Sequence, residues 1–424
     1  MKKPEILSPA GNMERLKYAL AYGADAVYIG GRDYSLRAKA SNFSINDIKR
    51  ATGIAHAAGK KLYVTMNIFA RNSDLNNLAG YIDSIASAGV DAVIVADPGV
   101  LSIVRKVAPQ LRIHISTQAN VTNTAAAEFW GEMGASRVVL ARELSVAEVA
   151  EIAQNTSVET EVFIHGAMCI AYSGRCLMSK FLANRDGNRG DCAHSCRWKY
   201  YLVEEKRPGQ YNEVQEDDKG TYFFNSKDLA LIGHIPELMK CGLDSLKIEG
   251  RMKSTHYVAA ITKIYRKAVD LYFSDPDNYR PDPDWFEEIE KVSHRQYSTG
   301  FFLGDKGEEI LDYARYEKTH DFVGLVRGYD PVKGLVEVEV RNRLSTAEPI
   351  EILSPDGLVK DYYIQGMLDL REYMAVNVSH AGFRIGIPSK EPWPEFAVLR
   401  RRVARAIGDR SVLASGTIHP LPTH

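Results

Sequence analysis

Cysteine is scarce in this sequence, which has five among its 424 residues. No run of about 18 apolar residues occurs, so no membrane span is expected. The N-terminal residues MKKPEILSPAG lack the apolar core of a secretory signal, and the chain is therefore expected in the cytoplasm. Thiols stay reduced in that compartment, so clustered cysteines more often ligate a metal there than form disulfides.

A strong net charge and several catalytic motifs are missing as well. The formal net charge is −1, so any RNA contact would have to come from local basic patches. No G-x-G-x-x-G follows the first expected strand, which argues against a dinucleotide-binding sheet. Neither H-E-x-x-H nor G-x-S-x-G occurs, which excludes two common hydrolase patterns. The composition, 45% hydrophobic and 25% charged, is that of an ordinary globular protein.

What is present is a recurring unit of a helix, a glycine and a short apolar strand. Its glycines suit the left-handed position that ends a helix, and the runs after them are typical of parallel strands buried on both faces. The copies follow Gly23, Gly59, Gly89, Gly134 and Gly242. About eight strands between Glu5 and Ile248 alternate with helices, which predicts a (β/α)8 TIM-like barrel over residues 1–273. An open doubly wound sheet is the alternative.

The rest of the chain is expected to form smaller units. A polar stretch, KRPGQYNEVQEDDKG, indicates a surface loop or hairpin inserted before the last barrel strand. Residues 274–320 are rich in helix-breaking residues and predict a linker with one short helix. Alternating polar and apolar residues over 321–400 predict a small all-β barrel, and residues 401–424 form a basic segment and tail.

Four of the five cysteines lie in one loop, residues 165–200. Cys169, Cys176, Cys192 and Cys196 have the spacing C-x6-C-x15-C-x3-C, which does not fit the paired knuckles of structural zinc sites. Iron–sulfur clusters tolerate irregular spacing, so an iron–sulfur site is favoured, with zinc and unrelated thiols left open. The loop follows the expected strand Glu159–Ile164, which would place it on the active-site rim of a barrel.

Other polar residues that follow expected strands are candidates for the same rim. Arginines there could clamp a dicarboxylate, Glu249 could act as a base, and His165 could activate a cysteine nucleophile. Salt bridges that close the rim, or buried polar groups satisfied by loop backbone, would look the same in sequence. The substrate-binding candidates are Asn67, Gln118, Arg142, Glu143, Arg175 and Arg197, and the catalytic candidates are His165, Glu249 and Arg251.

Two groups of basic residues could contact an RNA backbone, although charged surfaces are often only solvated. The first borders the cysteine loop, and the second lies near the C-terminus. Their members are Lys180, Arg185, Arg189, Arg197 and Lys199 in the first group, and Arg400, Arg401, Arg402, Arg405 and Arg410 in the second.

A family resemblance rests on the cysteine segment. Residues Glu161 to Ser179 fit every specified position of E-x-F-x2-G-[SA]-[LIVM]-C-x4-G-x-C-x-[LIVM]-S, which resembles the signature of peptidase family U-32. Segments LSPAG, NSKDL, KIEGRMK and TGFFLG are also similar to the family, and the final strands resemble its C-terminal barrel domain. The resemblance therefore spans nearly the whole chain.

Despite the family's name, the resemblance implies hydroxylation, because its better-understood members act on tRNA, ribosomal RNA or ubiquinone precursors. The plan of this chain resembles the tRNA branch, which implies conversion of wobble uridine to 5-hydroxyuridine with prephenate as hydroxyl source. The implied partners are tRNA, through its anticodon region, and a paralogous subunit. A peptidase, and a hydroxylase of another RNA or of a quinone precursor, are the alternatives.

The resemblance also implies a 4Fe-4S cluster on four cysteines. Cys169 and Cys176 lie inside the signature, whereas Cys192 and Cys196 follow by position.

Overall fold

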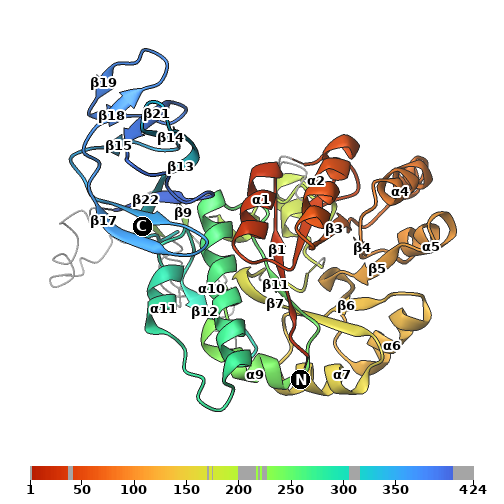
Figure 1. The fold of residues 1–424 in the computed structure, drawn as a ribbon. Coiled ribbons are helices and arrows are strands. Elements are labelled where there is room, and N and C mark those ends of the chain that lie inside the picture. Colours follow the sequence, from red (N-terminus) through yellow and green to blue (C-terminus); the bar gives the residue numbers. More distant parts are fainter. Residues whose placement is uncertain are drawn as a thin grey trace, which may run out of the picture.

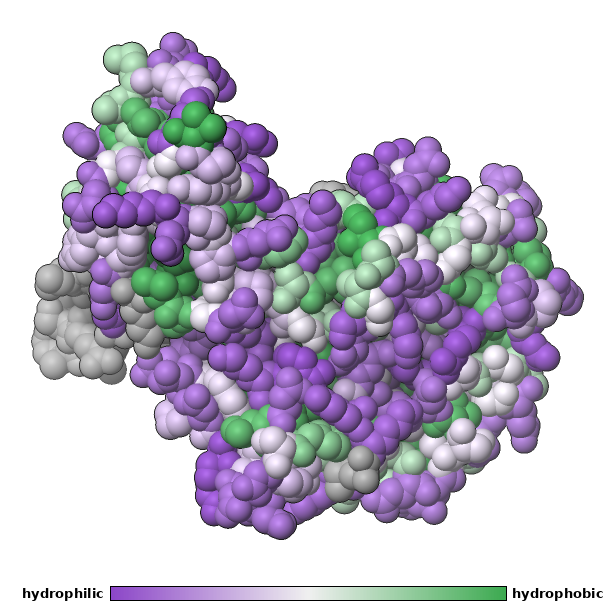
Figure 2. Space-filling view, viewed as in Figure 1, coloured by the Kyte–Doolittle hydropathy of each residue, from purple (hydrophilic) through white to green (hydrophobic). Residues whose placement is uncertain are grey.

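A computed structural model describes residues 2–36, 42–169, 171–173, 175–198, 216–217, 220–221, 227–304 and 316–403 (Figure 1). The chain forms a barrel surrounded by helices and a β-rich C-terminal domain beside it. In the space-filling view the C-terminal domain stands as a second lobe, with a notch between the two lobes (Figure 2). This arrangement places residues of both lobes at one shared seam.

Eight parallel strands close the barrel. Each is hydrogen-bonded to the next along the chain, and the last strand pairs with both β7 and β1. The strands are β1 (Glu5–Pro9), β2 (Ala26–Gly30), β3 (Lys61–Met66), β4 (Ala92–Val95), β5 (Arg112–Ile115), β6 (Arg137–Val139), β7 (Glu159–Ala167) and β11 (Ser245–Ile248). The predicted TIM-like barrel is confirmed, and the alternative of an open sheet is wrong.

The helices cover the outside of the barrel. Several begin at a side-chain cap: Ser44 and Ser145 each accept from the backbone three residues on and form a capping box. Gly23, Gly89 and Gly242 have positive φ just after a helix, as the repeated unit predicts. The helices of this part are α1 (Met13–Ala21), α2 (Ile45–Ala57), α3 (Asn72–Leu75), α4 (Leu78–Ser87), α5 (Pro98–Val107), α6 (Thr124–Glu132), α7 (Val146–Asn155), α9 (Ile235–Lys240) and α10 (Thr255–Ser274).

A long insertion separates β7 from β11. It contains α8 (Met178–Ala183), the small hairpin of β8 (Glu216–Asp217) and β9 (Gly220–Thr221), and β10 (Asp228–Ala230). Strand β10 runs antiparallel to β7 and parallel to β12 (Tyr297–Ser298), so it extends the sheet at the β7 edge. The hairpin agrees with one of the two structures predicted for the polar stretch.

Charged side chains fill the interior at the amino ends of the strands. Glu161 is fully buried and is paired with Lys247 at 2.9 Å and with Arg137 at 3.1 Å. Arg137 also contacts Glu5 at 2.8 Å, and the Tyr63 hydroxyl donates to Glu5 at 2.8 Å. Opposite charges and hydrogen bonds compensate the desolvation of these groups. The barrel is therefore filled at this end by an ion-pair network.

The C-terminal domain is an antiparallel all-β structure. Its main sheet has the order β17-β16-β22-β13-β14-β21-β18-β19, and its apolar face encloses a core of its own that includes Val336, Ile385 and Leu399. The elements after α10 are α11 (Pro283–Ile289), β13 (His320–Asp330), β14 (Leu335–Val340), β15 (Leu344–Ser345), β16 (Ile350–Leu353), β17 (Leu358–Tyr362), β18 (Met367–Asp369), β19 (Ala375–Val376), β20 (Val378–Ser379), β21 (Arg384–Pro388) and β22 (Val398–Arg402).

One residue of a predicted basic surface is instead part of the seam between the lobes, whereas Arg402 is exposed. Arg400 lies in β22, is fully buried, and pairs with Glu288 of α11 and with Glu351 at 2.7 Å. Arg401 pairs with Asp321 at 3.1 Å. The prediction that Arg400 belongs to an RNA-binding patch is therefore wrong, because two carboxylates bury its charge. Arg405 and Arg410 lie outside the described residues.

None of the described helices combines the length and the apolar character that crossing a membrane requires.

Candidate active site

The segment that carries the cysteines crosses the mouth of the barrel at the carboxyl ends of the strands. It leaves β7 at Ala167 and contacts loops that follow β3, β5 and β6. Catalytic groups of TIM barrels gather at this end. The described part of this segment, residues 167–198 with two gaps, is called the cysteine segment below.

The near side of the segment is attached to the loops after β5 and β6. Arg142 donates to the Ala167 carbonyl at 2.9 Å and to the Ser173 hydroxyl at 2.5 Å. Asn120 donates to the Ser173 carbonyl at 3.2 Å and accepts from Arg175 Nε at 2.9 Å. Two of the arginines predicted to bind a dicarboxylate thus hold the segment in place through internal hydrogen bonds.

The far side is attached to the loop after β3. Arg189 forms two hydrogen bonds with Asp74, at 2.6 and 2.9 Å, and the Phe69 amide donates to the Asn188 carbonyl at 3.4 Å. Arg189 holds the pKa of the Asp74 carboxyl below its ordinary value. Asp74 was not identified from the sequence, because nothing local connects it with a residue more than a hundred positions away.

None of the four thiols is in a disulfide, and all four lie on this one segment. Cys169 is exposed, whereas Cys176, Cys192 and Cys196 are half-buried. The His194 amide donates to Cys192 Sγ at 3.3 Å. Thiols of this number fit a soft metal chemically. Their positions do not yet form a ligand cage, since no three His, Cys, Asp or Glu side chains among the described residues converge as metal ligands.

A cavity of about 480 Å³ lies between the cysteine segment and the exit of β11. Cys192, Arg185 and His194 line it from the segment, and Glu249 and Lys253 line it from the residues after β11. The Tyr28 hydroxyl donates to Glu249 Oε2 at 3.2 Å, which fixes one oxygen of this carboxylate. Of the three catalytic candidates, Glu249 is therefore the one that lines this cavity.

Lys253 is a cation of this cavity that the sequence analysis did not select as a site residue. Its Nζ donates to the Ser293 carbonyl at 2.7 Å and lies 5.2 Å from the Tyr257 ring centre. The sequence signal that could have identified Lys253 is its position in KIEGRMK, two residues after Arg251. The turn after β11 directs Arg251 to the buried hydroxyls under the rim and Lys253 to the cavity, and the sequence does not show this difference.

His165 lies away from the thiols because β7 contains a bulge. Phe163 is opposite Lys247, but the next residue of β11 is opposite His165, so one extra residue turns the ring outward. Tyr265 and Tyr297 hydroxyls lie 3.4 Å from its two ring nitrogens. Burial lowers the pKa of His165 to about 3, so the ring is neutral. The structure does not bring His165 to a cysteine as a base.

Arg251 is buried beneath the rim. Its Nη1 donates to the hydroxyls of Ser35 and Thr65, both at 2.7 Å, and its Nη2 donates to the Leu36 carbonyl. The guanidinium passes so close to Gly30 that a β-carbon there would lie 2.3 Å from Nη1. Arg251 therefore joins three neighbouring elements of the rim from inside.

Polar groups below the segment retain unused hydrogen-bonding capacity. Gln118 is buried and accepts from Asn67 Nδ2 at 2.6 Å, while its own Nε2 has no partner among the described residues. One oxygen of Glu143 likewise has no partner within the described chain, and burial raises the pKa of this carboxyl. The Arg197 side chain lies outside what the structure describes.

Comparison with known proteins places this arrangement in a family. The sequence profile described as Peptidase family U32 matches residues 11–312, and that described as Peptidase family U32 C-terminal domain matches residues 318–400.

Two curated relatives have similar length. The chain is 45% identical over 357 residues to tRNA hydroxylation protein P1 of Bacillus subtilis (strain 168), covering 84% of each protein. It is 39% identical over 401 residues to tRNA hydroxylation protein P of Escherichia coli (strain K12), covering 84% of this chain and 87% of that one.

A third relative is longer. The 23S rRNA 5-hydroxycytidine C2501 synthase of Escherichia coli (strain K12) is 34% identical over 360 residues, which are 84% of this chain and 52% of that protein. The resemblance inferred from the cysteine signature is confirmed by these matches over most of the chain. The chain belongs to peptidase family U32.

Proposed function

We propose that this chain hydroxylates RNA, and specifically that it converts the wobble uridine of tRNA to 5-hydroxyuridine in the cytoplasm. The observation that carries the proposal is the cysteine segment held over the barrel mouth beside a cavity lined by Glu249 and Lys253. The names of the relatives, two tRNA hydroxylation proteins and a 5-hydroxycytidine synthase, support a hydroxylation of RNA.

The peptidase alternative lacks a suitable pair of groups. A cysteine protease needs a histidine within hydrogen-bond reach of its thiol. His165 is buried among tyrosines, whose hydroxyls lie next to both of its ring nitrogens, and Cys192 Sγ accepts from the His194 backbone amide. The geometry of the described histidines therefore favours a ligand role for the cysteines over a nucleophilic one.

The same cavity supplies the charges that a dicarboxylate such as prephenate requires. Arg185, which also pairs with Asp191 at 2.8 Å, lines it from the cysteine segment, and Lys253 lines it from the residues after β11; guanidinium and ammonium groups pair with carboxylates. Glu249, held by Tyr28, would hold or accept a proton next to the bound acid. In this proposal Arg142, Arg175 and Arg251 position the walls of the site and do not contact the co-substrate.

We further propose that Cys169, Cys176, Cys192 and Cys196 hold a 4Fe-4S cluster. When bound, it would supply a redox-active centre beside the cavity. The lack of any disulfide among the four cysteines and their common segment support this assignment. The attachment of the segment at both ends would let the thiols gather by a local movement while the barrel stays unchanged.

A deletion strain grown without oxygen tests the activity. We expect 5-hydroxyuridine and its derivatives at the wobble position to disappear, as measured by mass spectrometry of tRNA nucleosides. The wild-type gene should restore them and Cys169→Ala should not. Unchanged 5-oxyuridine derivatives in the anaerobic deletion strain would overturn the tRNA proposal.

The cluster has a separate test with a matched control. Anaerobically purified wild-type protein should be brown and contain iron and acid-labile sulfide, both of which Cys169→Ala should reduce strongly. Cys241→Ala should keep them, because Cys241 is buried at the end of α9, where its thiol contacts the Val146 and Glu237 carbonyls. A colourless wild-type preparation without iron would refute the cluster.

A further inference from the structure

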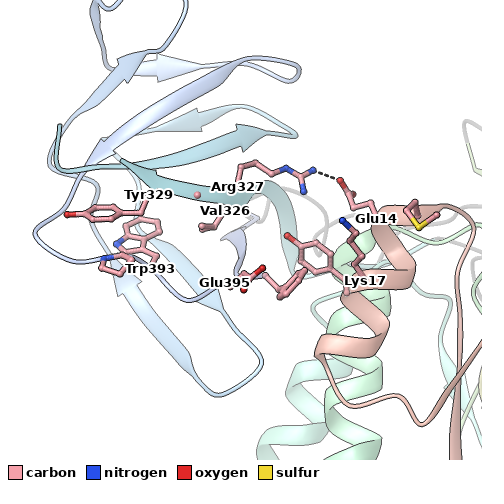
Figure 3. A pocket seen from close by; sticks show the side chains of 12 residues that line it. Glu14, Lys17, Val326, Arg327, Tyr329, Trp393 and Glu395 are labelled. Atoms are coloured by element: carbon pink, nitrogen blue, oxygen red, sulfur yellow. Dashed lines mark hydrogen bonds and ion pairs between the residues drawn. The ribbon is translucent and has the colours of Figure 1, made fainter. Parts of the chain in front are cut away.

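A second pocket, of about 580 Å³, lies at the seam between α1 and the C-terminal domain (Figure 3). We infer that this pocket binds one nucleobase of a single-stranded RNA segment, outside the nucleotide that is modified. The inference rests on the proposed function, since it assumes an RNA substrate. It assigns to the seam a recognition role that is separate from the chemistry at the barrel mouth.

The walls of the pocket are aromatic and come from both lobes. Tyr329 and Trp393 line it from the C-terminal domain (Figure 3), and Tyr18 is the aromatic lining residue that α1 contributes. Trp393 packs edge-on against Tyr362 with ring centres 5.2 Å apart, and Tyr18 packs edge-on against Phe396 at 5.4 Å. Neighbouring rings thus hold these walls in fixed orientations, as stacking on a flat base requires.

The Tyr18 hydroxyl supplies an unsatisfied polar group in this wall. The side chain is only 2% exposed, and its hydroxyl has no hydrogen-bond partner among the described residues. Buried hydroxyls are normally paired, so an unpaired one next to a pocket points to a polar ligand atom. A nucleobase carries polar atoms of this kind along the edge of its ring, and its flat face remains available for stacking.

Of the charged side chains around the pocket, some are already in ion pairs and others are not. Glu14 is occupied by Arg327, by Arg341 at 2.5 Å and by the Thr255 hydroxyl at 2.7 Å. Lys17 extends from α1 towards the C-terminal domain, and no ion pair joins it to any described residue (Figure 3). Lys17 can therefore bind the phosphate of a nucleotide whose base is stacked in the pocket.

Glu395 adds a preference among the bases. It is exposed, lines the pocket opposite α1, and has no hydrogen-bond partner within the described chain. A carboxylate accepts from amino and imino groups, which guanine offers on one edge and uracil largely lacks. The pocket therefore favours an amino-bearing base, which would differ from the uridine proposed for the barrel mouth.

The pocket lies close to the catalytic end of the barrel. Helix α1 follows β1 directly, so its first turn is at the carboxyl end of the strands. Arg15 of that turn donates to the carbonyl of Arg251, just after β11, at 3.1 Å. One RNA strand can consequently reach the mouth with one nucleotide and the seam with another.

Binding of a fluorescent anticodon stem–loop to the full-length, anaerobically purified protein tests the inference. Abasic sites are placed at each loop position in turn. We expect one position other than the target uridine to weaken wild-type binding about tenfold, the scale of a lost stacking contact. The same abasic site should have no further effect on Trp393→Leu, which removes the stacking face but keeps an apolar residue.

Two milder variants have matched controls. Tyr18→Phe and Lys17→Met should each weaken binding about threefold to tenfold, the size of one lost polar contact. Tyr363→Phe should not, because that side chain is 53% exposed and does not line the pocket. Lys49→Met, on the exposed face of α2, should also leave binding unchanged.

The outcomes separate this inference from the proposed function. If the wild type binds and modifies RNA but the pocket variants bind equally well, the pocket inference is wrong and the proposed function stands. If the wild type neither binds nor modifies RNA, both fail. If GMP binds the wild type but not Trp393→Leu, and no loop position matters, the pocket takes a free nucleotide and the RNA inference is overturned.

Discussion

Asp74 and Arg189 are 115 residues apart and form a two-bond ion pair across the barrel mouth, with contacts of 2.6 and 2.9 Å. The pair joins the loop after β3 to the part of the cysteine segment that precedes Cys192. Arg142 attaches the other side of the segment through Ala167 and Ser173. The segment is thus fixed at two edges, with its thiols between them.

Asp74→Asn should loosen the far edge of the segment, because the amide keeps the shape but removes the charge that holds Arg189. Backbone amides of residues 185–192 should exchange with deuterium about fivefold faster, the factor for roughly 1 kcal/mol. Asp47→Asn is the control, since Asp47 pairs with Arg50 within α2. Unchanged exchange in Asp74→Asn would contradict a role for this pair in holding the segment.

Lys247→Met should destabilise the barrel strongly. Lys247 is buried and lies 2.9 Å from the fully buried Glu161, which would keep only Arg137 as a charged partner. Removing one member of such a pair costs about 3 kcal/mol in the free energy of unfolding, measurable by urea denaturation. Lys61→Met should cost less than about 1 kcal/mol, because Lys61 is 48% exposed where it pairs with Glu5. Equal losses of unfolding free energy in Lys247→Met and Lys61→Met would show that burial does not determine the cost of removing these lysines.

The pH dependence of stability should show the neutral state of His165. Its pKa is about 3 in the folded chain, against 6.5 for the ordinary side chain. Between these values the unfolded chain binds a proton that the folded chain does not, so stability falls as the pH falls from 6.5 towards 3. The slope is about 1.4 kcal/mol per pH unit for this group.

His165→Phe should make that slope shallower by about the same amount, as followed by urea unfolding at several pH values. His114 and His256, whose pKa values burial also lowers, remain in both proteins and provide a common background. Equal slopes in the two proteins would mean that His165 is protonated in the folded state.

Gly166→Ala should disturb the catalytic end of β7. Gly166 has φ of +110°, and a β-carbon there would lie 2.5 Å from the backbone oxygen of Glu249. Both strain and a clash with backbone are expected, so the melting temperature should fall and, under the proposed function, modification of tRNA should decrease. Gly53→Ala, within α2 where no atom lies within 4 Å of the added carbon, should stabilise by about 0.5–1 kcal/mol. An unchanged melting temperature in Gly166→Ala would contradict the close approach of residue 166 to the Glu249 backbone oxygen.

The barrel was predictable because its signals are local. Each strand is an apolar run that follows a helix and a glycine, and residues such as Gly23 and Gly242 adopt the positive φ that this pattern requires. The same local reasoning did not identify β17, β18, β21 and β22. Strand β21 pairs with β14, and β22 pairs with β13 and β16; these partners are distant in sequence, so no local pattern records the pairing that stabilises the two strands.

The individual site residues were less predictable, because their roles depend on contacts between distant segments. His165 follows the expected strand, but a bulge in β7 turns it outward. Arg400 is part of a basic run, yet Glu288 and Glu351 bury it at the seam. Arg142 lies on the rim as expected, while its hydrogen bonds go to the cysteine segment. Sequence located these residues but did not determine what they contact.

The ion-pair network around Glu161 and Arg137 closes the barrel at the amino ends of the strands. Side chains that are at most 5% exposed occupy the interior at the amino ends of the strands. A molecule that reaches the centre must therefore leave by the way it entered, past the cysteine segment. Under the proposed function, product still in place would block the next substrate, so release of the modified RNA would have to precede each new turnover.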